Sequence, residues 1–317
     1  MSAGWLARRL LLALFAAFGV SVLVFALIRL VPGDVVTNLI GLEGNVSPEQ
    51  QAEMRRLFGL DQPIPVQFGT WLGALLHGDL GVSLRTARPV FTDLMLRFPV
   101  TLELTVLALL MALLIGVPLG VTAALNRGKA ADVLSSSFVL IGLAAPEFWL
   151  ALLLILLLSL TWRVFPPNGF VPLPESLGQN LRSLFLPSLA LSLGLAAAVT
   201  RIVRASLLEV LGQDYVRTAR AKGLRERVVV YRHAMRNALI PVVTVVGLQV
   251  GSLLGGAVII EQIFGLPGVG RYALEGINLR DYPVVQGAVL FIAVSFVLVN
   301  VLVDVLYLLI DRRVVFS

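Results

Sequence analysis

The residues best suited to bind another protein lie in one basic stretch between two long apolar runs. From Arg201 to Arg236 the sequence holds nine Lys and Arg residues, while the apolar runs on either side hold almost none. About two or three positive charges are enough to orient a membrane protein, so this excess indicates a second purpose. Short helices around Gly223 would present the charges to a soluble partner. The stretch therefore predicts a docking surface at the membrane boundary.

Local signals divide this basic stretch into two short helices. Asp214 can cap the first helix, Tyr215 to Ala221, because its carboxylate suits the positive end of the helix dipole. Gly223 follows the helix and permits the left-handed turn that reverses the chain. A second helix, Glu226 to Met235, would lead back to the membrane.

The side chains of the first helix supply the candidate contacts. Arg217 and Arg220 lie one turn apart and share a face. Thr218 and Ala219 are small enough for a partner to approach closely. The same positive charges also suit anionic lipid headgroups. Composition alone therefore leaves a simple membrane anchor open as the alternative interpretation.

Three carboxylates at or near membrane depth are candidates for a translocation path, namely Glu147, Glu103 and Glu261. Ionisable groups in a bilayer are costly, and they commonly pair or line a water-filled path. Glu147 follows Pro146, which frees backbone groups within its apolar run. Glu103 and Glu261 lie near the outer ends of their runs, where we expect solvent to reach them.

Composition excludes several kinds of chemistry. The chain has no cysteine, so disulfides and thiolate metal sites are excluded. His77 and His233 are expected on opposite sides of the membrane and cannot share a metal ion. No P-loop is present, so we expect no ATP hydrolysis by this chain and no cofactor in it. No catalytic residues, metal site or nucleic-acid partner are predicted.

The elements that must position these residues are transmembrane helices. The chain is 58% hydrophobic and 14% charged, with a mean hydropathy of +0.91, whereas soluble domains are about 25% charged. A helix needs about 20 apolar residues to cross a bilayer. Six runs meet that need, and they predict an all-α integral membrane protein with six transmembrane helices: Leu10–Ile28, Leu104–Asn126, Val133–Trp162, Ser183–Thr200, Asn237–Ile260 and Tyr282–Val303.

Charge asymmetry sets the expected orientation. With the N-terminus inside, 15 of the 25 Lys and Arg residues fall in cytoplasmic segments. Positive charges are enriched in cytoplasmic loops, so we predict that both termini are inside. The first run is longer than the apolar core of a signal peptide, and we expect it to be an uncleaved helix.

The long outer segment, Val31 to Val100, is predicted to contain three helices. The first begins at a capping box at Ser47 and ends near Phe58. The second, Pro65 to His77, has one apolar face, composed of Phe68, Trp71, Leu72 and Leu75. The third begins at Pro89 and ends before Pro99. Their apolar faces either lie on the membrane surface or cover the outer ends of the spans.

Two strings in the basic stretch resemble the coupling loop of ATP-binding-cassette importer permeases, in the form found in the peptide and nickel transport subfamily. They are Arg217-Thr-Ala-Arg-Ala-Lys-Gly223 and Arg232-His-Ala-Met-Arg-Asn-Ala-Leu-Ile-Pro241. Further matching strings are Val31-Pro-Gly-Asp34, Gly78-Asp-Leu-Gly81, Phe98-Pro-Val-Thr-Leu102, Gly116-Val-Pro-Leu-Gly120 and Phe264-Gly-Leu-Pro-Gly268. The chain resembles the first permease subunit of a dipeptide or oligopeptide importer. It departs from the family pattern at Glu147, where similar sequences have a small polar residue.

The resemblance implies a type I importer permease of the bacterial inner membrane that catalyses nothing itself. It implies these partners: a homologous second permease, two ATPase subunits that bind ATP and Mg, an extracytoplasmic binding protein that contacts the outer segment, a peptide substrate and the lipid bilayer. The coupling loop, residues 206–238, would act through Asp214, Tyr215, Arg217, Thr218, Ala219, Arg220, Gly223, His233 and Arg236.

The expected domains are residues 1–94 (first helix and outer segment), 95–310 (a five-helix core with the coupling loop) and 311–317 (a cytoplasmic tail). Import of a nickel chelate or glutathione by the same family stays open. A self-sufficient secondary transporter or channel is the alternative of another class, although no inverted repeat is present. An intramembrane hydrolase is disfavoured because both histidines lie outside the spans.

Overall fold

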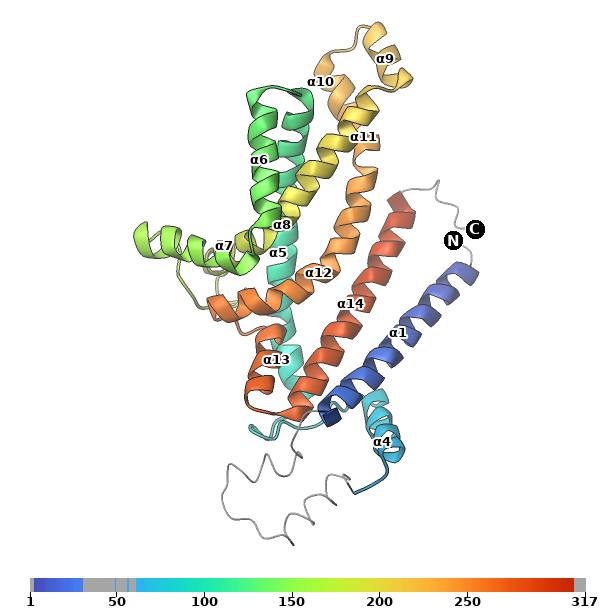
Figure 1. Cartoon of the computed structure of the whole chain (residues 1–317), viewed down its shortest axis with the longest axis vertical. Helices are drawn as coiled ribbons and strands as arrows, with labels where there is room; N and C mark the ends of the chain where they lie inside the picture. Colours follow the sequence, from blue (N-terminus) through green and yellow to red (C-terminus); the bar gives the residue numbers. More distant parts are fainter. Residues whose placement is uncertain (1–2, 31–48, 50–55, 57–60, 311–317) are drawn as a thin grey trace. The chain divides into compact units, whose positions relative to one another are not determined.

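The computed structural model describes residues 3–30, 49, 56 and 61–310, and these form helices joined by turns. One isolated bridge pairs Val82 with Pro89. Figure 1 shows the helices along the chain. The described chain divides into two compact units, which we consider separately. The first unit holds residues 1–99 and 267–298, and the second holds residues 100–266 and 299–317. The all-α fold class is therefore confirmed for the described residues.

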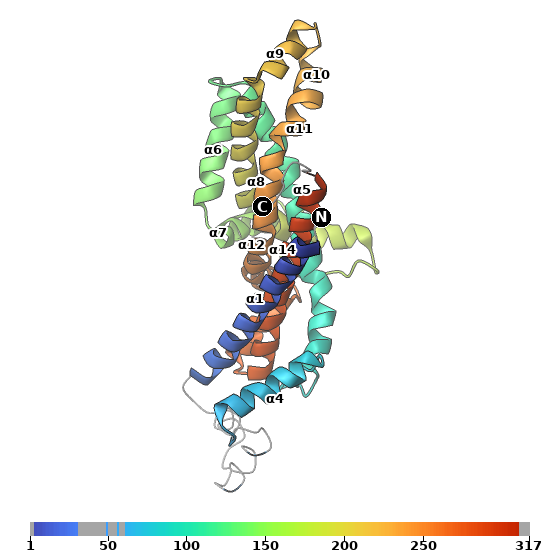
Figure 2. The same ribbon diagram turned by 90° about the vertical axis from the view of Figure 1, so that its right-hand side faces the viewer.

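In the first unit, α1 (Ala3–Leu30) packs against α4 (Ile64–Leu76), and Figure 2 shows α4 beside one end of α1. The ring of Phe25 lies 5.1 Å from that of Phe68 and 5.6 Å from that of Trp71. The predicted apolar face of this outer helix therefore covers α1. Gly78, with a φ of 81°, follows directly after the C-terminal cap of α4.

The rest of the first unit joins the start of α5 (Val90–Leu125) to α13 (Val269–Asn278) and α14 (Tyr282–Ile310). Tyr272 is the centre of this contact. Its hydroxyl donates to Asp93 at 3.3 Å, and the guanidinium of Arg97 lies 4.5 Å from its ring centroid. Burial and the neighbouring Asp93 carboxylate raise the pKa of Tyr272 to about 12. The phenol therefore stays neutral and serves as a donor.

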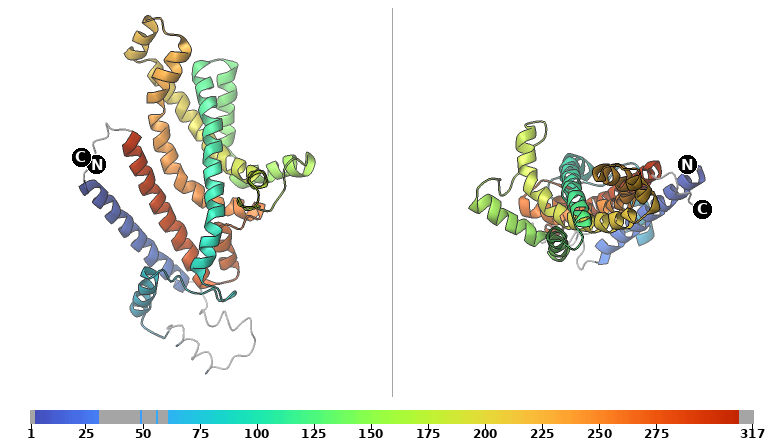
Figure 3. Two further views of the ribbon diagram at one scale, coloured as in Figure 1. Left: turned by 180° about the vertical axis from the view of Figure 1, so that it is seen from behind. Right: turned by 90° about the horizontal axis from the view of Figure 1, so that it is seen from above.

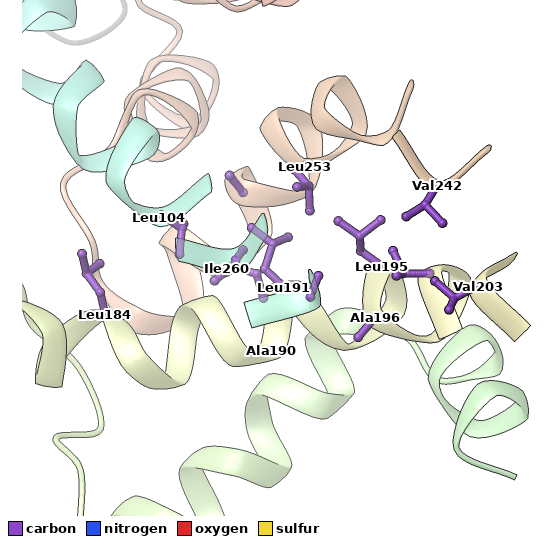
Figure 4. Close-up of a cluster of buried hydrophobic side chains, with 14 of the residues drawn as sticks. Leu104, Leu184, Ala190, Leu191, Leu195, Ala196, Val203, Val242, Leu253 and Ile260 are labelled. Atoms are coloured by element: carbon purple, nitrogen blue, oxygen red, sulfur yellow. The ribbon is translucent and has the colours of Figure 1, made fainter. Parts of the chain in front are cut away.

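The second unit is built around α8 (Leu177–Leu211), which packs against α6 (Ala130–Ala144), α7 (Glu147–Leu154) and α12 (Ile240–Phe264). Figure 4 shows the apolar core, to which α5, α8 and α12 contribute Leu104, Leu184, Ala190, Leu191, Leu195, Ala196, Val203, Val242, Leu253 and Ile260. Burial of this apolar surface holds α5, α6, α7 and α12 in fixed positions around α8.

Glycines let α5 and α6 approach α8 closely. A Cβ atom at Gly120 would lie 2.6 Å from the Cβ of Val203 and 2.8 Å from the carbonyl oxygen of Thr200. A Cβ at Gly142 would lie 2.8 Å from the Cβ of Ala197. Small residues at such contacts are typical of helix pairs in membranes, where close packing replaces the hydrophobic effect.

The predicted apolar runs all fall on helices, but the number of spans is not settled by length and composition. Among the described residues, three helices are long and apolar enough to cross a membrane, or five if each of two bent pairs counts as one span. The described apolar part of α1, Leu11–Ala26, is shorter than that test requires. The six-span count therefore stays a prediction.

Two details of the predicted elements are wrong. The run Val133–Trp162 is not one helix, because it breaks at Pro146 and the two halves meet at 109°. The second half is α7, which continues into the π-helix η1 (Ile155–Thr161), and Figure 3 shows it running away from α6. The third outer helix does not end before Pro99, since α5 continues through that residue. The capping box at Ser47 and the tail 311–317 lie outside the described residues.

Candidate functional site

The docking loop, residues 206–238, lies at one end of α8 (Figures 1 and 2). It holds α9 (Asp214–Ala221), α10 (Glu226–Val228), the π-helix η2 (Val229–Ala234) and α11 (Met235–Ala238). Both predicted short helices are present, the second with a π-helical middle. Asp214 is the first residue of α9, and Gln213 holds the cap position without a side-chain bond. The predicted capping role of Asp214 is thus wrong, although its charge still suits the helix dipole.

A small apolar cluster fixes α9 on the end of α8. Val216, Ala219 and Val229 are buried together, with Val210 and Leu211 of α8 packed against them. Ala219 is only 8% exposed, so it faces the interior of the loop. The prediction that Ala219 leaves room for a partner is therefore wrong.

An ion pair between Arg220 and Glu226 joins α9 to α10 across the turn. The guanidinium donates to the two carboxylate oxygens at 3.1 and 2.7 Å, and it lowers the pKa of Glu226 below its ordinary value. Arg217 behaves differently, because among the described residues it pairs only with Asp214 of the same helix, at 3.4 Å, and its side chain is largely exposed. Of the two arginines, only Arg217 is left open to a partner.

Two further features set the direction of α9. The amide of Asn237 in α11 donates to the hydroxyl of Tyr215 at 2.9 Å. Gly223 has a φ of 76°, the left-handed conformation predicted for it. Apart from Gly223 and its chain neighbours, no atom of the described residues lies within 4 Å of the position a Cβ would take at Gly223. A side chain there would therefore strain the backbone without meeting a steric clash.

The outward surface of the loop is basic. Five cationic side chains are exposed and form no ion pair within the described part of the chain: Lys222, Arg225, Arg227, Arg232 and Arg236. Tyr231 lies among them with 63% of its surface exposed, and His233 is half-buried. Thr218 is exposed, and its hydroxyl donates to the carbonyl of Asp214 at 2.9 Å. The surface can accept an acidic or hydrogen-bond-accepting partner.

Several of these contacts were missed from sequence. Val216 and Val229 were not named, and Glu226 and Asn237 were named only as the ends of predicted elements or within a longer string. One signal was present, because Val216 precedes Ala219 by three residues and such a pair shares one helix face. An apolar residue in an otherwise charged helix indicates the buried side.

The three candidate carboxylates occupy different environments in the second unit. Glu147 begins α7 directly after the break, is half-buried and has no hydrogen bond or ion pair within the described residues. Glu103 is also half-buried, and it accepts from the amide of Asn180 at 2.9 Å. That amide, itself only 2% exposed, also donates to the carbonyl of Val171. The structure therefore holds Glu103 in place and leaves Glu147 available.

Glu261 does not fit its predicted environment. Its side chain is 0% exposed and accepts from the hydroxyl of Thr101 at 2.6 Å. We expected solvent at this position, but the packing of α12 against α5 covers it. Glu261 therefore links two helices within the chain. Within residues 3–30, 49, 56 and 61–310, no three His, Asp or Glu side chains gather to hold a metal ion.

Apolar helices long enough to cross a membrane and an exposed basic loop fit a membrane transport subunit, and comparisons with known proteins show the family. The chain belongs to the family described as the binding-protein-dependent transport system inner membrane component, whose model matches residues 116–316; the model of the family's N-terminal part matches residues 3–105. It is therefore a multi-pass protein of the inner membrane and a translocating component, not an enzyme.

Relatives of known function match over nearly the full length. The chain is 41% identical to the dipeptide transport system permease protein DppB of Escherichia coli K12, over 97% of each chain. It is 43% identical to the di/tripeptide transport system permease protein DppB of Pseudomonas aeruginosa, over 98% of each. A chain of the inward-facing MetNI methionine ABC transporter superimposes with a TM-score of 0.56 at 19% identity, over 69% of this chain and 97% of that one. That likeness concerns the fold alone.

Proposed function

We propose that this chain is a permease subunit of an ATP-driven, binding-protein-dependent importer of dipeptides or short oligopeptides. The observation that carries the proposal is the docking loop, a basic two-helix projection held rigidly on the central helix α8. Its relatives named as dipeptide and di/tripeptide permeases support peptides as the substrate. ATP and Mg would bind to the partner ATPase subunits, not to this chain.

The arrangement in the membrane completes the proposal. Six spans with both termini inside would place the docking loop on the cytoplasmic side, in keeping with the distribution of positive charge. Residues 1–94 would form the first span and the outer segment, residues 95–310 the five-helix core and residues 311–317 the tail. A homologous second permease would complete the path, and a binding protein would deliver peptide at the outer segment.

The docking loop would transmit ATPase movements to the membrane. We propose that α9 enters a groove on an ATPase subunit and presents Asp214, Tyr215, Arg217 and Thr218. The neighbouring cations, Arg236 included, and His233 would flank that contact. Arg220 and Ala219 would act from within, by holding α9 at a fixed angle. A rigid contact of this kind can convert closure of the ATPases into a change of the permease.

The translocation path would use Glu147 and Glu103. Both are half-buried carboxylates on helices of the second unit, and a peptide carries an ammonium group that a carboxylate can bind. Glu147 is the stronger candidate, because it has no partner within the described chain and an unpaired carboxylate at membrane depth is costly.

Uptake by reconstituted vesicles tests the proposal. The chain is assembled with its second permease, its ATPases and its binding protein, and labelled dipeptide is supplied on the binding-protein side. We expect uptake only when ATP is present on the ATPase side and the binding protein on the other. Uptake driven by an ion gradient without ATP would instead indicate a secondary transporter and contradict the proposal.

A further inference from the structure

A bidentate ion pair joins α6 to α8 near the end of α8 that leads into the docking loop. The carboxylate of Asp132 accepts from Nε of Arg204 at 2.6 Å and from Nη2 at 2.9 Å. The Asp132 side chain is 9% exposed and that of Arg204 is 32% exposed. Paired hydrogen bonds between a guanidinium and a carboxylate fix distance and orientation together.

The same carboxylate also fastens the turn between α5 and α6. It accepts from the backbone N–H of Gly128 at 3.0 Å, and Gly128 is in the left-handed conformation, with a φ of 77°. Asp132 therefore connects this turn, the first turn of α6 and the last third of α8. Arg204 lies seven residues before Leu211, the last residue of α8, which is about 10 Å along the helix at about 1.5 Å per residue.

The α6–α8 interface is thus fixed at two points. Near the far end of α6, Gly142 lies against Ala197 of α8, close enough that an added Cβ would overlap. Two residues after α6 ends, the chain bends by 109° at Pro146, and α7 begins with Glu147. Apolar contacts alone allow helices to slide past each other by small amounts. The ion pair opposes such sliding.

We propose that Asp132 and Arg204 are positioning residues that make α6 follow α8, so that a displacement of the docking loop reaches the bend at Pro146 and the carboxylate of Glu147. This proposal rests on the proposed function of the docking loop. It adds a connection within the permease between the surface that receives the ATPase movement and the candidate path residue.

The test measures peptide uptake per ATP hydrolysed by the complete importer in vesicles. The variants are Asp132→Asn, Arg204→Gln and the double variant Asp132→Asn with Arg204→Gln. Each single variant should lower the ratio of uptake to hydrolysis about fivefold, which corresponds to the lower end of the usual coupling energies between two sites. The ATPase subunits should remain bound. The double variant should be no worse than the poorer single variant, because both changes remove one interaction.

Arg201→Gln is the matched control, because Arg201 lies on α8 before the docking loop of residues 206–238, is exposed and has no ion pair within the described residues. It should keep the ratio of the unmodified importer. If Asp132→Asn fails to assemble, Asp132→Glu retains the charge and should assemble with a ratio closer to normal than that of Arg204→Gln.

Unchanged ratios in both single variants, or losses that add in the double variant, would overturn the proposal. Gly223→Val, measured in the same preparation, separates this proposal from the proposed function. If Gly223→Val uncouples the importer and the ion-pair variants do not, the docking role stands and the α6–α8 connection fails. If Gly223→Val also leaves the ratio unchanged, the docking role fails as well.

Discussion

Two kinds of interaction hold α9 in place, and their magnitudes differ. Val216 is 0% exposed in its cluster, and removing buried methyl groups costs about 1–3 kcal/mol. The pair formed by Arg220 and Glu226 is about half exposed, and such pairs contribute about 0–1 kcal/mol. The apolar cluster should therefore hold the helix, while the ion pair sets its angle to α10.

Proteolysis measures this difference. Trypsin cleaves after Lys222 and Arg225 when the loop opens locally. Val216→Ala should speed cleavage clearly more than Glu226→Gln, because it removes the larger interaction. Arg217→Gln serves as the control, since its ion pair lies on the exposed face of α9, and it should leave the rate nearly unchanged. A larger effect from Glu226→Gln than from Val216→Ala would contradict this account of the loop.

At the scale of single residues, the sequence predicted backbone conformation better than side-chain contacts. The left-handed turn at Gly223 was predictable, since few other residues tolerate that conformation. The ion pair between Arg220 and Glu226 was not predictable, because it depends on the angle between two helices. Ala219 was assigned to the wrong face, although Val216, three residues earlier on the same face, indicated the buried side. Ala219→Arg would break the loop's own apolar cluster.

At the scale of helices, proline effects depended on context. Pro146 ends one helix and precedes another, whereas Pro99 and Pro187 lie within helices that continue. A proline in a helix interior always removes one hydrogen bond, but packing around it decides whether the helix continues. Charge-free runs therefore located the helices of the core, and only the structure located the 109° break.

The close contact between α5 and α8 gives an element-scale prediction. Gly120→Ala should destabilise the folded permease by about 1–3 kcal/mol, the usual cost of overpacking, because a backbone oxygen of α8 stands within 2.8 Å of the new atom. Gly178→Ala is the control, since no neighbouring atom in the described part of the chain lies within 4 Å of its Cβ position. Thermal unfolding of the purified complexes should show a lower midpoint only for Gly120→Ala. Equal midpoints would contradict this prediction, because they would mean that α5 and α8 can move apart with no loss in the free energy of unfolding.

At the scale of the molecule, the structure shows what the apolar face of the outer segment packs against. Phe68 and Trp71 were predicted to form a face that meets either the membrane or the spans, and they pack on Phe25 of α1. Contact with a binding protein would therefore use other residues of the segment, such as the exposed Ile64 and Leu76 of α4. Sequence could identify the apolar face but not its neighbour.

The orientation of the chain is open to direct measurement, because the chain contains no cysteine. Single cysteines at Glu175 and Asn278 should react with an impermeant thiol reagent in intact cells. Cysteines at Lys129 and Gly212 should react only after the membrane is opened. All four positions are described as exposed, so a failure to react reports the side of the membrane. External labelling at Gly212 would reverse the orientation and remove the docking loop from the ATPases.

The account as a whole depends on the docking loop coupling ATPase movement to transport, and Gly223 tests this most directly. The measurement is peptide uptake per ATP hydrolysed by the complete importer in vesicles, compared for the unmodified chain, Gly223→Asn and Gly223→Val. Asparagine accepts the left-handed conformation, whereas valine in that conformation carries a backbone strain of roughly 1–2 kcal/mol. We expect the loop to relieve this strain by turning α9 away from its position on α8. We predict a near-normal ratio for Gly223→Asn and a ratio lowered about fivefold or more for Gly223→Val. A normal ratio for Gly223→Val, with the ATPases still bound, would contradict the account and leave the loop as an anchor for anionic lipid.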